Sequence, residues 1–437
     1  MNSSNYAVAV WEGSYNDGVF PLPVFASTRP PGGPWGPVVP VSSLLDEFGN
    51  NINPSVYVNE AGTALMTWRV SNNPGRLNAT LVSFLAFGGA WKPPFAVSSP
   101  TETNNDLDNS PHSALNERGD TVVAWFGGNI VTDEINVATY DSTTATWRPP
   151  VTLDSSPNVQ GFPFLNPVSA IDENGNAVVI WKNLNEIKSS YYLFDDVWEP
   201  SVTLSTNGSS PPYVIMDRAG NATAVWDENG GNILSASRPF GGGWSTPVII
   251  IQGGNDQMEN FLQQRDPVAV DLAGNVIAMW GETDSQQKLS AFKPFGQPWQ
   301  APELITARQS STYNIGLAEC GFAIASWRGR SDDGIDDIEA AINENVFPLI
   351  VRGSATLTHC KQQFATQKRY ISLLSWMPVS AECISAYNIY CGGKLVATTT
   401  DTSITIPGCG RIPCNFTITT INVSGNESDP IPFILNN

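Results

Sequence analysis

The run Asp172-Glu173-Asn174-Gly175-Asn176-Ala177-Val178-Val179-Ile180-Trp181 decides the fold, because similar runs recur along the chain. It joins a short polar segment containing glycine to an alternating apolar segment that ends in tryptophan. The apolar segments end, at intervals of 45–57 residues, at Trp11, Trp68, Trp125, Trp181, Trp226, Trp280 and Trp327. A regular interval of this length indicates a repeated structural unit.

The polar segment has Asn or Asp at its first position and Gly at its fourth. Asn and Asp side chains hydrogen-bond the backbone of tight turns, and Gly accepts a positive φ. The pattern therefore predicts a type I turn that closes a hairpin. It occurs at 59–62, 116–119, 172–175, 217–220 and 271–274.

Two further signals complete the unit. A proline four or five residues before each turn suits the first residue of a strand; these residues are Pro54, Pro111, Pro167, Pro212 and Pro267. A second set of tryptophans precedes a proline and opens another β run; it comprises Trp35, Trp91, Trp147, Trp198, Trp244 and Trp299. Each unit is therefore predicted to have four strands.

Repeated units of four short antiparallel strands are typical of β-propeller blades, which bury one another's faces. The fold class is therefore all-β, with a seven-bladed propeller predicted over residues 1–352 and six blades as the alternative. The chain begins at the second strand of its first blade. That blade is three-stranded, or has lost an upstream strand, or receives one from another chain.

Composition narrows the functional classes. The net charge is −19, which argues against a nucleic-acid partner because phosphate binding needs a cationic surface. No apolar run is long enough to span a bilayer, and the first residues do not resemble a signal peptide, so the protein is either cytosolic or has had a leader removed. Five of the six cysteines lie in the last fifth of the chain, so we expect disulfides and a secreted or cell-surface location.

Residues 353–437 are predicted to form a second domain. The strand ending at Trp376, the strand 386–390 and the run 416–428 resemble a fibronectin type III module. Phe416 stands where that family usually has a tyrosine that hydrogen-bonds across a corner. We expect a local disulfide between Cys409 and Cys414 to replace that bond. The pairing of the others stays open; they are Cys320, Cys360, Cys383 and Cys391.

The tryptophans have two interpretations. They could be sugar-stacking platforms, as in propeller lectins with one site per blade, or they could be core between blades. We favour core for both sets, because no polar residue recurs beside them. The turn is also similar to the sialidase Asp-box, which is itself structural. A sialidase would need an arginine cluster, a Tyr–Glu pair and an Asp acid/base. The arginines are scattered, so a carbohydrate-active enzyme is the minor alternative.

Acidic residues near 331–339 could supply oxygen ligands to Ca²⁺. The candidate ligands are Asp332, Asp333, Asp336 and Asp337. A solvated hairpin is the commoner role for such a segment, and no other cofactor is expected. We expect His112 and His359, the two histidines, to be structural or exposed.

These observations predict a non-catalytic extracellular or cell-surface recognition or adhesion protein. It would bind a glycan or a protein through the propeller. The alternatives are a surface-fibre subunit that a neighbouring copy completes with a strand, and a sialidase-like hydrolase or lyase.

Overall fold

A computed structural model gives the fold of the chain, which divides into two compact units. The first comprises Met1–Val268, Met279–Leu289 and Thr306–Thr312, and the second comprises Ala269–Ala278, Ser290–Ile305 and Tyr313–Asn437. The structure describes residues 2, 4–13, 23–42, 50–71, 79–98, 109–128, 132–157, 164–194, 197–253, 256–257, 267–271, 273–282, 287–306, 310–317, 323–330, 336–343, 355–363, 368–376, 384–407, 415–422, 427–428 and 430–435.

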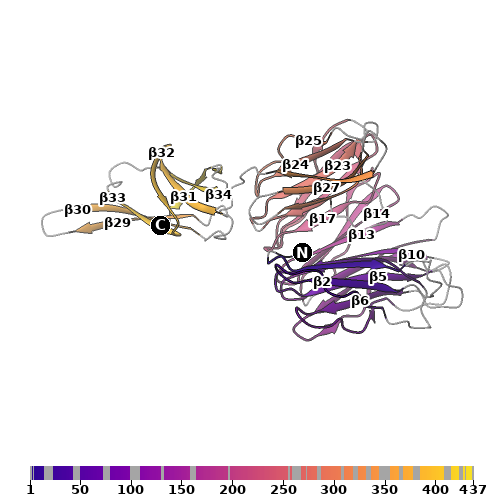
Figure 1. Ribbon diagram of the computed structural model, residues 1–437. Coiled ribbons are helices and arrows are strands. Elements are labelled where there is room, and N and C mark those ends of the chain that lie inside the picture. The colour runs from indigo at the N-terminus through magenta and orange to yellow at the C-terminus, as the bar shows by residue number, and fades with distance from the viewer. Residues whose placement is uncertain are drawn as a thin grey trace. The chain divides into compact units, whose positions relative to one another are not determined.

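Five consecutive antiparallel sheets lie in the first unit, and we call them blades 1 to 5 (Figure 1). Blade 1 contains β1 (Ala7–Glu12), β2 (Val24–Arg29) and β3 (Val39–Pro40). Blade 2 contains β4 (Asn50–Val58), β5 (Ala64–Ser71), β6 (Ala79–Leu85) and β7 (Phe95–Ala96). Blade 3 contains β8 (Asn109–Leu115), β9 (Thr121–Gly128), β10 (Thr132–Asp141), β11 (Thr146–Trp147) and β12 (Val151–Pro157).

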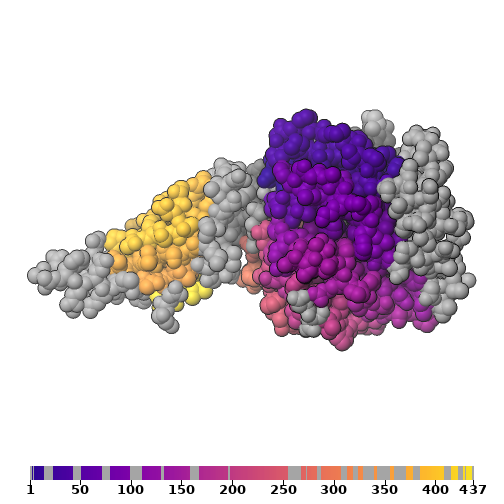
Figure 2. Space-filling model, turned by 90° about the horizontal axis from the view of Figure 1, so that it is seen from below, coloured from indigo at the N-terminus to yellow at the C-terminus, as the bar shows by residue number. Residues whose placement is uncertain are grey.

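Blades 4 and 5 follow the same order. Blade 4 contains β13 (Phe164–Ile171), β14 (Ala177–Asn183), β15 (Glu186–Tyr192) and β16 (Val202–Ser205). Blade 5 contains β17 (Tyr213–Met216), β18 (Ala222–Glu228), β19 (Asn232–Arg238) and β20 (Val248–Ile251). Neighbouring blades meet through their first strands, since β13 contacts both β8 and β17. Figure 2 shows these blades following one another from indigo to pink. The arrangement is propeller-like.

The next strands are β21 (Asp256–Gln257), β22 (Val268–Val270), β23 (Val276–Glu282), β24 (Lys288–Lys293), β25 (Glu303–Thr306), β26 (Ser310–Leu317), β27 (Ala323–Arg330) and β28 (Asp336–Asn343). All seven predicted runs that end in the first-set tryptophans are strands: β1, β5, β9, β14, β18, β23 and β27. The described residues contain no helix, and hence none long and apolar enough to cross a membrane.

The predicted turns are confirmed. The Gly62 N–H donates to the Asn59 carbonyl oxygen at 3.0 Å, and Gly62 has a φ of 79°. A Cβ on Gly62 would lie 2.8 Å from the Phe87 ring, so this position needs glycine for space as well as for conformation.

The prolines lie differently from the prediction in three blades. Pro54, Pro111 and Pro167 lie inside β4, β8 and β13, where the register of pairing shifts. A bulge leaves one residue outside the hydrogen-bonding ladder, and proline has no N–H to lose there. Each first strand therefore begins before its proline.

The first-set tryptophans fill the space between blades, as the sequence predicts. Trp68, Trp181 and Trp226 are fully buried, and the apolar clusters around them each combine residues of two consecutive blades. Trp181 donates its indole N–H to Asp154 of blade 3 at 3.0 Å. Trp11 is the exception, since it is 37% exposed in the three-stranded blade 1.

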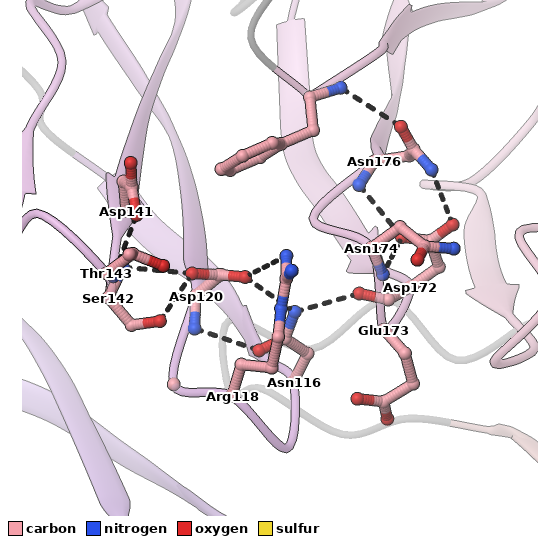
Figure 3. A network of polar contacts seen from close by, with 12 residues as sticks. Asn116, Arg118, Asp120, Asp141, Ser142, Thr143, Asp172, Glu173, Asn174 and Asn176 are labelled. Atoms are coloured by element: carbon pink, nitrogen blue, oxygen red, sulfur yellow. Dashed lines mark hydrogen bonds and ion pairs between the residues drawn. The ribbon is translucent and has the colours of Figure 1, made fainter.

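Side chains of the turns form a ladder from blade to blade. Asn59 Nδ2 donates to the carbonyl oxygens of Asn116 and Glu117, at 3.0 and 3.2 Å. Asn116 Nδ2 donates in the same way to the Asp172 carbonyl oxygen at 3.0 Å (Figure 3). Asn2 starts the ladder by donating to the Asn59 carbonyl oxygen at 3.3 Å. These buried side chains connect blades 1 to 4.

An aspartate at the first turn position makes a different set of bonds. Asp172 Oδ2 accepts from Asn176 Nδ2 at 2.7 Å, and the Phe194 N–H donates to Asn176 Oδ1 at 3.0 Å (Figure 3). The turn of blade 4 is thereby fastened to the connection that follows β15 in the same blade. Asp217 and Asn221 of blade 5 pair in the same way, at 2.8 Å.

The C-terminal part of the second unit contains two four-stranded sheets. One contains β29 (Thr356–Gln363), β30 (Lys368–Ser375), β33 (Ser403–Pro407) and β36 (Ile434–Leu435), and the other β31 (Ile384–Cys391), β32 (Lys394–Thr399), β34 (Phe416–Asn422) and β35 (Ile431–Pro432). Trp376, Tyr387 and Phe416 share one buried cluster with residues of both sheets. Cys391 is disulfide-bonded. The predicted Cys409–Cys414 bridge and the predicted domain boundary after residue 352 lie outside the described residues.

Candidate functional site

A pocket of about 310 Å³ lies between blades 4 and 5. It is lined by Ser189, Tyr191, Glu199, Pro200, Val202, Thr203, Leu204, Arg238, Gly243, Trp244, Ser245 and Pro247. Small-molecule sites in proteins range from about 300 to 1,000 Å³. The pocket is at the lower end of that range and suits a ligand of single-ring size.

Strand geometry brings the polar residues together. Ser189 and Tyr191 are two residues apart in β15, so they point to the same face of blade 4. Arg238 is the last residue of β19, and Trp244 follows it in the connection to β20. Glu199 lies between β15 and β16, where its N–H donates to the Tyr191 carbonyl oxygen at 2.7 Å. Each blade thus contributes one wall.

Arg238 and Glu199 form an ion pair across the two blades. Arg238 Nη2 donates to both carboxylate oxygens, at 3.1 and 3.2 Å. The arginine side chain is only 7% exposed, whereas the glutamate side chain is 46% exposed. The carboxylate can therefore accept hydrogen bonds from a ligand while it holds the guanidinium in place.

Two donors of the pocket residues have no hydrogen-bond partner among the described residues. They are Arg238 Nη1 and the Tyr191 hydroxyl, and both are buried. The guanidinium carbon lies 3.5 Å from the centre of the Tyr191 ring. A buried donor without a partner costs about 1–3 kcal/mol, so a ligand or water that accepts from it stabilises the site.

Burial raises the pKa of Tyr191 to about 12, and the charge of Asp172 adds to this while Arg238 opposes it. The hydroxyl is therefore protonated at neutral pH and can donate a hydrogen bond.

Trp244 forms the aromatic wall. Its indole N–H donates to Ser189 Oγ at 3.1 Å, which fixes the ring across the blade boundary. The ring packs against the apolar cluster shared by blades 4 and 5 but stays partly exposed. Of the two predicted roles for the second set, core packing and ligand stacking, Trp244 is placed for both.

Other second-set tryptophans contact aromatic or basic side chains of their own or neighbouring blades. Trp198 stacks on Tyr192 with ring centres 5.3 Å apart, and Trp147 stacks on Phe95 at 6.0 Å. Trp35 is 49% exposed, with the Arg29 guanidinium 5.7 Å from its ring centre.

The pocket chemistry is not repeated around blades 1 to 5. The strands at the third repeat position are β2, β6, β10, β15 and β19, and they end, in order, at Arg29, Leu85, Asp141, Tyr192 and Arg238. The residues after the second-set tryptophans are, in order, Gly36, Lys92, Arg148, Glu199 and Ser245. An acid in one blade therefore faces an arginine of the next only between blades 4 and 5 of these described blades.

The acidic segment predicted to bind Ca²⁺ is described only in part. Asp332 and Asp333 lie outside the described residues, whereas Asp336 and Asp337 start β28, opposite Arg330 and Gly329. No group of three or more His, Cys, Asp or Glu side chains in the described ranges could hold a metal ion.

His112 has a structural setting, as predicted. It is buried, and its Nδ1 accepts from the Ser169 N–H at 3.1 Å, while Nε2 lies 3.3 Å from the Tyr57 hydroxyl. These bonds join the first strands of blades 2, 3 and 4. The His359 side chain lies outside the described residues.

Sequence reasoning missed Tyr191, Glu199 and Arg238. It looked for polar residues that recur beside the tryptophans, and these three break the repeat. Departure from the repeat consensus at Glu199 and Arg238 is the signal that could have identified them.

No protein-family profile and no curated protein matches the chain. Among solved structures, it is similar to a protein of unknown function from Dyadobacter fermentans, with 13% identity and a TM-score of 0.40 over 69% of this chain and 96% of that one. A six-bladed fucose-recognising lectin from Aleuria aurantia shows 10% identity and a TM-score of 0.37 over 69% and 96%. The polysaccharide lyase Uly1 shows 9% identity and a TM-score of 0.44 over 77% and 87%. Likeness at this level assigns no function to the chain.

Proposed function

We propose that the protein is a non-catalytic glycan-binding protein whose ligand occupies the pocket between blades 4 and 5. One observation carries the proposal: a partly exposed indole, Trp244, lies beside a half-exposed carboxylate that is held by a buried arginine. Sugar rings have apolar C–H faces that pack on aromatic rings, and hydroxyl groups that both donate and accept. The pocket offers a partner for each.

The polar groups favour binding over hydrolysis. A glycosidase ordinarily uses two carboxyl groups on either side of the bond that it cleaves. Glu199 is the one carboxylate among the lining residues of this pocket. The same lining lacks the arginine cluster and the Asp acid/base of a sialidase, which supports recognition as the role of this site.

The wider organisation extends the proposal. The chain is proposed to be a secreted or cell-surface protein with seven propeller blades and a C-terminal fibronectin type III-like module. Seven strands ending in or near a first-set tryptophan, two C-terminal sheets that share a core, and the disulfide at Cys391 support it.

A glycan array probed with three versions of the full chain tests the proposal. Wild type is expected to bind a defined set of glycans, and Trp244→Ala to lose at least tenfold in affinity, about 1.4 kcal/mol. Trp35→Ala is the matched control, since Trp35 has the same repeat position in blade 1 but does not line the pocket. An array without binding by wild type, or equal binding by Trp244→Ala, would contradict the proposal.

A further inference from the structure

The charges that line the pocket carry an inference about its ligand, which rests on the proposed function. We propose that the pocket selects a neutral sugar with adjacent hydroxyl groups over the corresponding uronic acid, and that Glu199 sets this selection.

The pocket offers no net charge to an anion. Arg238 and Glu199 are the charged side chains among its lining residues, and they already neutralise each other at 3.1 Å. A ligand carboxylate would be attracted by Arg238 and repelled by Glu199 at similar distances. It would lose its hydration without gaining a compensating charge, and burial of an uncompensated charge is unfavourable.

The donors and acceptors also suit hydroxyl groups. An ionised glutamate only accepts hydrogen bonds, so the exposed part of Glu199 requires a donor. A sugar hydroxyl supplies that donor. A uronide keeps its ring hydroxyls, but at C6 it presents a charged acceptor in place of a hydroxyl donor. Arg238 Nη1 and the Tyr191 hydroxyl both donate and have no partner among the described residues, so they require an acceptor.

Two adjacent hydroxyls meet both requirements at once. One donates to Glu199, and the oxygen of the other accepts from Arg238 or Tyr191. Glu199 is thus a specificity-determining residue, because it accepts from a neutral ligand and repels an anionic one.

Calorimetric titration of the full chain with matched methyl glycosides tests this selection. The pairs are galactoside with galacturonide and glucoside with glucuronide, in which the CH2OH group at C6 is replaced by a carboxylate. For the pair whose neutral member binds, wild type is expected to prefer that member at least tenfold. Glu199→Gln leaves Arg238 with its charge uncompensated, so the preference is expected to fall below threefold and uronide binding to weaken with added salt.

Tyr191→Phe serves as a second variant. The variant keeps the ring against Arg238 and removes only the hydroxyl, which makes no hydrogen bond of good geometry among the described residues. The unfolding midpoint is therefore expected to stay within the error of the wild type while the neutral ligand binds at least threefold more weakly. Equal or tighter uronide binding by wild type, or an unchanged preference in Glu199→Gln, overturns the inference. If wild type binds the uronide and Trp244→Ala loses this binding, the pocket is a glycan site, so the proposed function stands while the proposed selection for a neutral sugar is refuted. No binding of any glycan overturns both.

Discussion

The turn ladder makes a prediction that can be worked out bond by bond. Asn59→Ala removes the Asn59 Nδ2 donor to the carbonyl oxygens of Asn116 and Glu117, at 3.0 and 3.2 Å, and the Oδ1 acceptor of the Thr63 N–H at 2.8 Å. A hydrogen bond contributes about 1 kcal/mol net, and more is lost where a buried partner is left unpaired. The free energy of unfolding is therefore expected to fall by about 3 kcal/mol.

Urea unfolding, followed by tryptophan fluorescence, measures this loss, since the first-set indoles lie between the blades that the ladder joins. Asn174→Ala is the matched control, because Asn174 lies at the exposed third position of a ladder turn and should change the free energy by less than about 0.5 kcal/mol. Asn59→Asp keeps the acceptor for Thr63 but turns a carboxylate toward two carbonyl oxygens, so it should be no more stable than Asn59→Ala. A loss below about 1 kcal/mol for both Asn59 variants would refute the ladder as a source of stability.

Three further predictions follow from burial, charge and the repeat. Burial raises the pKa of Asp227, while hydrogen bonds from Ser209 and Ser210 oppose this, so the ionised carboxylate disfavours folding. The stability of wild type relative to Asp227→Asn should therefore fall as the pH rises through the raised pKa. A stability difference that does not depend on pH would contradict the reasoning. Trp181→Ala should cost about 3–5 kcal/mol in urea unfolding because the ring is fully buried between blades 3 and 4, and a loss below about 1 kcal/mol would show that the ring is not core. Calorimetric titration of wild type should give fewer glycan sites than one per blade, because the Arg238–Glu199 pair has no equivalent in the described blades 1 to 4; one site per blade would refute this.

The sequence predicts the β-strands and turns of the described blades, but it does not predict the pocket. The run that ends in Trp181 and the turn before it predict a strand pair, because backbone preferences and apolar alternation are local properties of the sequence. The sequence around Asn59 gives no sign of the hydrogen bonds that this side chain makes to blade 3. Those bonds depend on how two turns of different blades approach each other. Pro111 marks a strand, but its place at a bulge depends on pairing with β9.

The pocket depends on residues that are distant in sequence and outside the repeat. Glu199 and Arg238 are 39 positions apart, and only the packing of blade 4 on blade 5 brings them to 3.1 Å. The unpaired donors at Arg238 and Tyr191 are likewise a result of that packing. A periodic signal cannot report a site that occurs once among the described blades 1 to 5.

A crystal structure of the chain with the neutral glycoside that binds best tests the central claim most directly. The account predicts one sugar ring between blades 4 and 5, packed on Trp244, with a hydroxyl donating to Glu199. Electron density for the sugar at another face, with only water in this pocket, would contradict it.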